Sequence, residues 1–218
     1  MGLSGVIEFL TELSHNNNKE WFDANRKRYE ACRATFISLV GELIEGIAAF
    51  DPSVIGVDPR KCVFRINRDI RFAKDKTPYK TNFGALIGEQ GKKTEGTGYY
   101  IHIAPGHHFI GGGMYKPQPD SLANIRQEID YNGASLKEIL DEPDFKQTFG
   151  QVRGEQLKTA PKGYPKDHPM IEILRYKSFY VLREMSEGEL TAKNFVEEAV
   201  RTYAKAGKFN QFLKNAIN

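Results

Sequence analysis

The fold is decided by a stretch near the middle of the chain, residues 98–115, which reads GYYIHIAPGHHFIGGGMY. Two runs rich in aromatic and β-branched residues, 99–104 and 108–115, flank the pair Pro105-Gly106. Pro and Gly favour tight turns, whereas aromatic and β-branched side chains suit a pleated strand. The stretch therefore predicts a β-hairpin of two antiparallel strands.

Strand-like segments also precede the hairpin. Residues 62–72 alternate between apolar and polar side chains, with Phe64, Ile66, Ile70 and Phe72 on one side. Alternation with a period of two predicts a strand whose polar residues face away from the core. Elsewhere the sequence predicts a loop at 74–80, a strand at about 82–89 and a last strand at about 178–184.

Helical periodicity dominates both ends of the chain. It predicts a helix over about 5–13 and a long helix from Asn18 to about Phe50, where Asp51-Pro52 ends it. After the hairpin we expect helices from Pro119, over 135–149, around 168–175, and from Thr191 to about Leu213. Strands grouped between helices, without βαβ alternation, predict an α+β fold. A central antiparallel sheet, about 62–115 plus 178–184, would be flanked by the long N-terminal helix and the C-terminal helices.

The composition is that of an ordinary soluble globular protein. The 218 residues are 40% hydrophobic and 27% charged, with no linker, repeat or low-complexity tract. We therefore expect a single domain, 1–218. No apolar run approaches the roughly 18 residues of a membrane-spanning helix, and the N-terminus lacks the basic start of a secretory signal. Because Cys32 and Cys62 cannot form a disulfide framework, we expect a cytoplasmic protein with no membrane partner.

Charge is distributed very unevenly along the chain. Residues 60–80 contain eight Lys and Arg against two Asp, a local charge of +6. The rest of the chain has 23 positive and 26 negative residues, so the overall charge of +3 hides one strongly basic segment. Such a concentration of cations indicates an anionic partner or internal acids that neutralise it.

On the predicted strand, Arg65, Asp69 and Arg71 project from the same face. Arginine side chains bind phosphate and carboxylate groups with two parallel hydrogen bonds. We therefore expect Arg65 and Arg71 to hold an anionic ligand, with a phosphate-bearing small molecule or nucleotide favoured. Asp69 would orient the arginines or act as a base. Lys74, Lys76 and Lys80 would line the rim of this site.

Catalysis is one extension of this hypothesis. His102 shares its strand face with Tyr100, so it would join the polar face. Hydrolysis or group transfer at a phosphate or carboxylate would then use Asp69 or His102 as the proton carrier. An enzyme of this kind predicts a recessed pocket around a strongly shifted acid or histidine.

Two other interpretations remain open. A non-catalytic nucleic-acid or protein interaction module would present a broad positive surface, with Phe72 and Tyr79 available to stack on bases. No nucleic-acid motif accompanies the segment, and the pI of about 8.7 is below that of most basic domains. A purely structural network would instead pair Arg65, Arg68 and Arg71 with internal carboxylates such as Asp23 or Glu20.

Three further features carry less weight. The glycine run 111–113 indicates a bulge or the close approach of another backbone, with an anion cradle as the sharper alternative. The cluster of His102, His107 and His108 lacks any metal-binding pattern, so we expect no metal and no cofactor. Cys62 opens the basic segment, where neighbouring cations would lower its pKa, although a catalytic thiol is not favoured.

Four sequence motifs resemble those of one family, and the resemblance spans almost the whole chain, from about Phe9 to Leu213. They are NNKEWFDANR at 17–26, the run 64–82, the pair GYYIHI and GGGMY of the hairpin, and LKTAPKGY at 157–164. The chain is similar here to the domain of unknown function 2461. The resemblance implies a single α+β domain and brings no established activity, cofactor or partner.

The resemblance also implies a set of recurrent polar positions, without assigning them roles. We take the set as candidate ligand-binding positions beside the two candidate proton carriers. Trp21, the only tryptophan, lies on the predicted long helix, where a core position is the ordinary explanation. The full set is Trp21, Arg26, Arg65, Arg68, Asp69, Arg71, Lys74, Lys76, Tyr79, Lys80, His102 and Tyr115.

Overall fold

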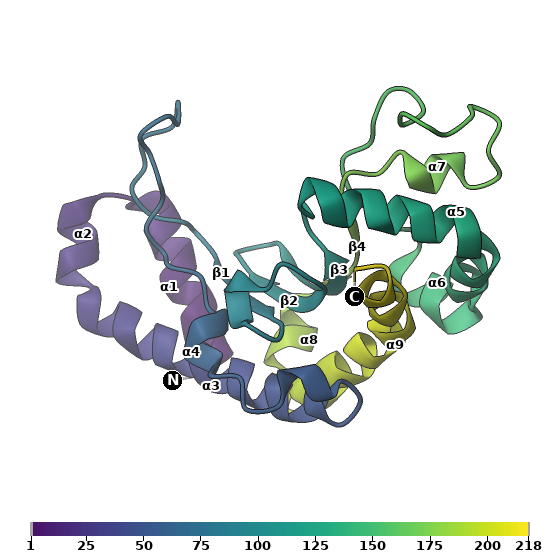
Figure 1. The fold of residues 1–218 in the computed structure, drawn as a ribbon. Helices are drawn as coiled ribbons and strands as arrows, with labels where there is room; N and C mark the ends of the chain where they lie inside the picture. Colours follow the sequence, from purple (N-terminus) through teal and green to yellow (C-terminus); the bar gives the residue numbers. More distant parts are fainter. Residues whose placement is uncertain (1, 218) are drawn as a thin grey trace. The chain divides into compact units, whose positions relative to one another are not determined.

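The computed structural model describes residues 2–217 as an α+β protein (Figure 1). Contacts divide the chain into two compact units. Unit 1 contains the residues up to 93 together with 100–110 and 184–200, and unit 2 contains 94–99, 111–183 and the residues from 201 onward. The expectation that residues 1–218 form a single domain stays a prediction. None of the helices within residues 2–217 combines the length and the apolar character needed to cross a membrane.

The predicted α+β fold with an antiparallel sheet is confirmed. The sheet has four strands in the order β1-β2-β3-β4, so each strand pairs with its neighbour in the chain. The hairpin predicted around Pro105-Gly106 is the pair β2 and β3. The strands are β1 (Phe83–Ile87), β2 (Gly98–Ile103), β3 (His108–Met114) and β4 (Phe179–Met185).

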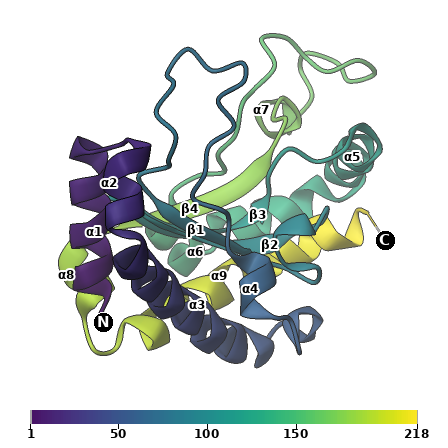
Figure 2. The same cartoon turned by 90° about the vertical axis from the view of Figure 1, so that its left-hand side faces the viewer.

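Unit 1 begins with α1 (Leu3–His15), α2 (Lys19–Ala24) and α3 (Arg26–Ala48) (Figure 2). The prediction of one long helix from Asn18 to Phe50 is wrong in one respect, because the helix is interrupted at Asn25. Asn25 has φ −102° and ψ 13°, outside the helical region, and its side-chain amide donates to the carbonyl of Trp21. This local hydrogen bond satisfies a free carbonyl at the end of α2 and lets the chain turn into α3.

The prediction of a regular strand over residues 62–72 is also wrong. Residues 59–62 form the short helix α4 (Pro59–Cys62), which follows the 3₁₀ turn η1 (Pro52–Val54), and only Val63 and Asn67 then make isolated antiparallel bridges. Asp58 starts α4 by accepting a hydrogen bond from the backbone of Arg60, and Pro59 suits its first position. The local turn chemistry therefore overrides the period-two pattern.

Unit 2 contains α5 (Pro119–Asp141), α6 (Pro143–Phe149), α7 (Ile171–Leu174) and most of α9 (Phe195–Asn215). Its core is a cluster of buried apolar side chains that includes Ile125, Phe145 and Phe209. The final helix begins at Phe195, not at Thr191. A separate short helix, α8 (Glu187–Thr191) of unit 1, comes first because Ser186 and Glu189 form a capping box.

The glycines of β3 serve the packing of unit 2. A Cβ atom at Gly111 would lie 2.0 Å from the carbonyl oxygen of Val181, and one at Gly113 would lie 2.2 Å from that of Phe179. Gly113 also has a φ of +128°, which side chains rarely adopt. The prediction that this run marks the close approach of another backbone is confirmed, and the backbone is β4.

Candidate anion-binding site

The basic loop, residues 63–80, extends away from β1 and is seen from two sides in Figures 1 and 2. Its two arms run antiparallel. The backbone N–H of Phe64 donates to the carbonyl of Gly84, and the N–H of Lys80 donates to the carbonyl of Ile66. The loop is therefore continuous with the edge of the sheet at β1.

The pairing register of the loop changes at Arg65. In a regular antiparallel ladder, pairing of Phe64 with Gly84 would place Ile66 opposite residue 82, but Ile66 pairs with Lys80. Two extra residues are thus inserted on the returning arm. Bulges of this kind redirect side chains and are common beside functional sites. The exposed Arg65 lies at the break in pairing, next to Lys80.

The base of the loop is fastened by Asn17, which precedes α2. Its side-chain amide donates to the carbonyl of Tyr79 at 2.9 Å and accepts from the N–H of Tyr79 at 3.0 Å. The Tyr79 ring is buried and stacks on Phe22 with 3.9 Å between the ring centroids. Tyr79, predicted as a ligand-binding residue, therefore anchors the loop and has little surface left for a ligand.

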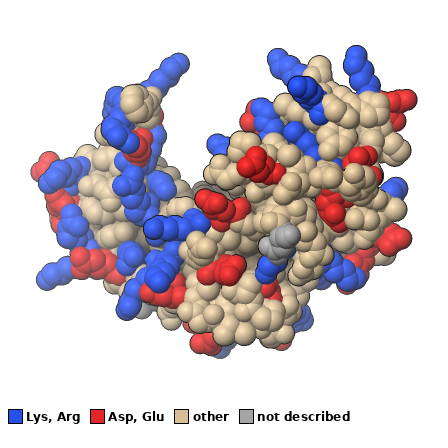
Figure 3. All heavy atoms as spheres, in the orientation of Figure 1, with Lys and Arg blue, Asp and Glu red and all other residues tan. Residues whose placement is uncertain are grey.

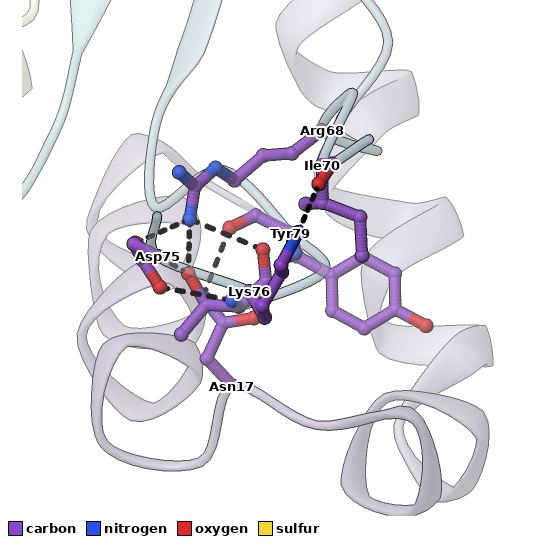
Figure 4. Close-up of polar contacts among 7 residues, drawn as sticks. Asn17, Arg68, Ile70, Asp75, Lys76 and Tyr79 are labelled. Atoms are coloured by element: carbon purple, nitrogen blue, oxygen red, sulfur yellow. Dashed lines mark hydrogen bonds and ion pairs between the residues drawn. The ribbon is translucent and has the colours of Figure 1, made fainter. Parts of the chain in front are cut away.

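The upper part of the loop is cross-linked by its own side chains (Figure 4). Arg68 contacts the Asp75 carboxylate, the Thr77 hydroxyl and, at 3.1 Å, the Thr77 carbonyl. The Lys76 ammonium donates to the Ile70 carbonyl at 2.9 Å. Hydrogen bonds from Thr77 and Arg68 lower the pKa of Asp75 to about 2. These contacts hold the loop in one shape.

Two of the three candidate arginines of the basic loop already have acidic partners. Arg68 pairs with Asp75, and Arg71 pairs with Asp69 at 2.7 Å, an interaction that lowers the pKa of the Asp69 carboxyl. The structural-network interpretation is therefore right for these two arginines, although their partners come from the loop itself. Asp23, proposed as a partner, instead pairs with Lys19 and Arg26.

Arg65 and Lys80 differ from the paired arginines. Within residues 2–217, no carboxylate lies within ion-pair distance of either side chain or of Lys74. Partial burial lowers the pKa of Lys80, and the charge of Arg65 lowers it further. The charges of Arg65 and Lys80 thus repel each other, and within the described range neither side chain forms an ion pair. Figure 3 shows Lys and Arg gathered over the loop and the surface at its base.

Beside these two cations, the outer face of the sheet carries an aromatic row, which we define as Phe64, Tyr100, His102 and Phe109. Lys80 Nζ lies 5.5 Å from the centroid of the Phe64 ring, and Phe64 meets the edge of Tyr100. His102 stacks on Phe109 with 4.6 Å between centroids and 9° between planes. All four rings are half-buried, so each keeps part of one surface open.

Gly84 makes room for this row. A Cβ atom at Gly84 would lie 2.5 Å from the Tyr100 hydroxyl oxygen, so only glycine lets the phenol lie across β1. The strand pattern predicts that Tyr100 and His102 share a face, but it did not link them to Phe64 and Phe109. The signal was present, because Tyr100 and His102 alternate with buried residues on one strand and Phe109 does the same on its neighbour.

The two candidate proton carriers are not brought together. Asp69 is held by Arg71, whereas the Nδ1 atom of His102 lies 3.4 Å from the Tyr100 hydroxyl. Burial lowers the pKa of His102 to about 4, with smaller contributions from His107 and His108. The imidazole is therefore neutral at pH 7, which suits stacking better than proton donation. Proton transfer by either group stays a prediction.

Three other candidates have separate surroundings. Trp21 lies on α2 with its ring 5.8 Å from that of Phe9, so it packs at the margin of the core. Arg26 forms an ion pair with Asp23. Tyr115 belongs to unit 2, where its exposed ring meets the edge of Tyr180.

Cys62 does not have the environment that the sequence suggested. Its thiol is buried, and burial together with Asp58 raises its pKa to about 11, in place of the lowering predicted from nearby cations. Across residues 2–217, no group of three or more His, Cys, Asp or Glu side chains is arranged to hold a metal ion.

Two hollows of unit 1 lie away from the predicted residues. One, of about 530 Å³, is lined by residues that include Ile55, Lys61 and Lys93. The other, of about 380 Å³, lies beside α3 and includes Arg33 and Arg60. Neither is lined by Arg65, Lys80 or the aromatic row. The predicted cations therefore do not line these two hollows.

The chain belongs to the family described as conserved hypothetical protein (DUF2461), whose model matches residues 5–212 of the 218. The match covers the basic loop, the aromatic row and both units. Comparisons with curated proteins and with solved structures returned no match.

Proposed function

We propose that this protein binds a phosphate-bearing ligand through Arg65 and Lys80, with a base or other flat group of the ligand stacked on the aromatic row. The observation that carries the proposal is the contrast within one loop. Arg68 and Arg71 have carboxylate partners, whereas Arg65 and Lys80 lie side by side without one.

Electrostatics supports an anion at this position. Partial burial is the main reason why the pKa of Lys80 is lowered, and the nearby positive charge of Arg65 lowers it further, so keeping both side chains charged costs free energy. A phosphate group between them would remove this repulsion and form charge-assisted hydrogen bonds with both side chains. The guanidinium of Arg65 would supply two parallel donors, and Lys80 would supply a point charge.

The aromatic row supports a ligand that is more than free phosphate. Half-buried rings next to Lys80, a cation without an acidic partner, match a nucleotide, whose base offers a flat surface and whose phosphate offers the negative charge. Asp69 is held by Arg71, whereas His102 lies beside Tyr100, and these different partners favour binding over the hydrolysis or group transfer considered from the sequence. The alternative of an interaction module therefore gains support at the expense of an enzyme.

Calorimetric titration with adenosine diphosphate, adenosine and inorganic phosphate tests the proposal. We expect the diphosphate to bind more tightly than adenosine or phosphate alone. Removal of one charge-assisted contact costs a factor of at least about ten in affinity. Both Arg65→Ala and Lys80→Met should therefore weaken diphosphate binding about tenfold or more.

The matched control is Lys27→Ala, which removes an exposed cation on α3 outside the loop. It should leave the affinity unchanged. Arg65→Ala should also leave the melting temperature without ligand unchanged, because Arg65 has no acidic partner to lose. Equal affinities of the wild type, Arg65→Ala and Lys80→Met for the diphosphate would refute the proposal.

A further inference from the structure

We infer that the ligand is single-stranded nucleic acid, which follows the basic loop from the aromatic row to the exposed ring of Phe72. The inference rests on the proposed function, since it extends the same site from one phosphate to several. It uses three observations about the loop that a single nucleotide leaves unexplained.

The first observation is Phe72, which lies in the outer part of the basic loop. Phe72 is 95% exposed, the largest value among the exposed large apolar residues of the part of the chain that the structure describes. The ring lies beside the guanidinium of Arg71, whose Cζ is 5.9 Å from the ring centroid. A phenylalanine in water gains nothing for the fold, but it is a stacking surface for an unpaired base, and the neighbouring arginine adds a cation.

The second observation is the charge along the loop. Residues 65–80 contain six cations and two acids, and the two acids are paired with Arg68 and Arg71. Four cations remain outside ion pairs, and they come from both arms of the loop. They are Arg65, Lys74, Lys76 and Lys80. A ligand with phosphates at regular intervals would neutralise several of them at once.

The third observation is the order of the loop. Arg68 is bound to Asp75 and Thr77, and Lys76 is bound to the Ile70 carbonyl, so the part that carries Phe72 is held in place (Figure 4). A loop whose shape is fixed before binding loses less conformational entropy when a ligand attaches. The residues on either side of the turn that carries Phe72 are thus cross-linked before any ligand binds.

The length of the loop favours a polymer over a small molecule. Phe64 in the aromatic row and Phe72 are eight residues apart, which allows a separation of up to about 25 Å. Figures 1 and 2 both show the loop extending outward along its length. At a separation near that limit one nucleotide would not reach both rings, whereas a strand of several nucleotides would, with its phosphates on the cations between them.

Single strands fit this surface better than the alternatives. A duplex keeps its bases stacked inside, so it offers phosphates to the lysines but no base to Phe72. An acidic peptide would likewise satisfy the cations without using the aromatic rings. Both alternatives predict that Phe72 contributes nothing to affinity, which makes this residue the discriminating position.

Fluorescence anisotropy with labelled oligothymidylates of about 3, 6 and 12 nucleotides tests the inference. We expect affinity to rise with length and to fall between about 50 and 200 mM salt. Four neutralised phosphates would give a slope of about −3 in log affinity against log salt concentration. Phe72→Ala should weaken binding of the longest oligonucleotide at least about fivefold, with no effect on adenosine diphosphate.

Ile55→Ala is the matched control, because Ile55 is also exposed and apolar but lies outside the loop. It should leave oligonucleotide affinity unchanged. Lys74→Ala should lower the salt slope by about one. Phe72→Ala removes an exposed side chain, so an unchanged melting temperature will show that the variant is folded.

Three outcomes would overturn the inference. If the oligonucleotides bound no more tightly than adenosine diphosphate, the proposed function would stand, but a nucleic-acid strand would be ruled out as the ligand. If duplex DNA or polyglutamate competed for the loop as well as single strands did, and Phe72→Ala had no effect on binding, the loop would bind another kind of polyanion. Failure of all these ligands to bind would remove the proposed function as well.

Discussion

The glycine-rich strand β3 and the basic loop are the two segments of most unusual composition, and the protein uses them in different ways. In β3, Gly111 and Gly113 are required by the backbone of β4, which lies where their side chains would be. In the basic loop, Arg65, Lys74 and Phe72 have neither an acidic partner nor a place in the core. The backbone of β4 explains the glycines, whereas the proposed ligand site is based on the loop residues that packing leaves unexplained.

The largest expected effect tests the structural side of this comparison. Gly113→Ala would force a side chain into a φ of +128° and bring its Cβ to 2.2 Å from a carbonyl oxygen of β4. We expect the free energy of unfolding in urea to fall by about 3 kcal/mol or more, because both backbone strain and a steric clash act together.

Gly41→Ala is the matched control for that variant. Gly41 lies inside α3, and a Cβ there would meet only Pro59 Cγ at an ordinary 3.7 Å. Alanine is the better helix former, so this variant should gain about 0.5–1 kcal/mol. A Gly113→Ala protein as stable as the wild type would show that β3 does not need its glycine.

The next effect concerns the anchor of the basic loop. Asn17→Ala removes two hydrogen bonds to the backbone of Tyr79 and leaves that N–H and carbonyl without these partners. We expect a loss of about 2 kcal/mol in the free energy of unfolding and faster proteolytic cleavage within the loop.

Asn16→Ala provides the comparison, since the exposed Asn16 amide donates only to the carbonyl of Glu12 at the end of α1. Its effect should be well below that of Asn17→Ala. Cleavage of the loop at the wild-type rate in the Asn17→Ala protein would contradict the role of Asn17 as the anchor.

The smallest effect concerns the aromatic row at the base of the loop. The pKa of His102 is about 4 in the folded protein and near 6.5 in the unfolded chain, so only the unfolded chain takes up a proton between these values. The stability of the wild type should therefore decrease as the pH falls from about 6.5 through 4. We expect His102 to account for about 1 kcal/mol of this decrease, because the ring is still partly open to solvent.

His102→Phe keeps a ring stacked on Phe109 and removes the titration. Urea unfolding across this pH range should show a shallower decrease for the variant. Part of the pH dependence should persist, because burial also lowers the pKa of His108. A pH profile identical to that of the wild type would show that His102 is not sheltered in the folded protein.

The sequence predicted those features of the fold that depend on long patterns. The hairpin around Pro105-Gly106, the α+β class and the helices at both ends follow from periodicity over many residues. The break at Asn25 and the irregular course after Cys62 depend on single side chains that bond to nearby backbone, such as Asp58 to the N–H of Arg60. Such contacts leave no periodic signal.

The candidate site was predicted by residue type but not by role. Charge density pointed to the loop, yet it did not separate Arg68, which Asp75 binds, from Arg65, which lies at the change of register. Tyr79 resembled a ligand contact because its stacking on Phe22 depends on two segments distant in the sequence. The distinction between paired and unpaired cations needs the three-dimensional neighbours of each residue.

The single amide of Asn17 has a consequence for the chemical durability of the protein. Because this side chain both donates to and accepts from Tyr79, aspartate of nearly the same shape cannot replace it. Deamidation would set a carboxylate oxygen against the Tyr79 carbonyl at the former 2.9 Å contact, where two acceptors repel. Deamidation of this one side chain, with no change in the rest of the chain, would thus detach the basic loop from its anchor.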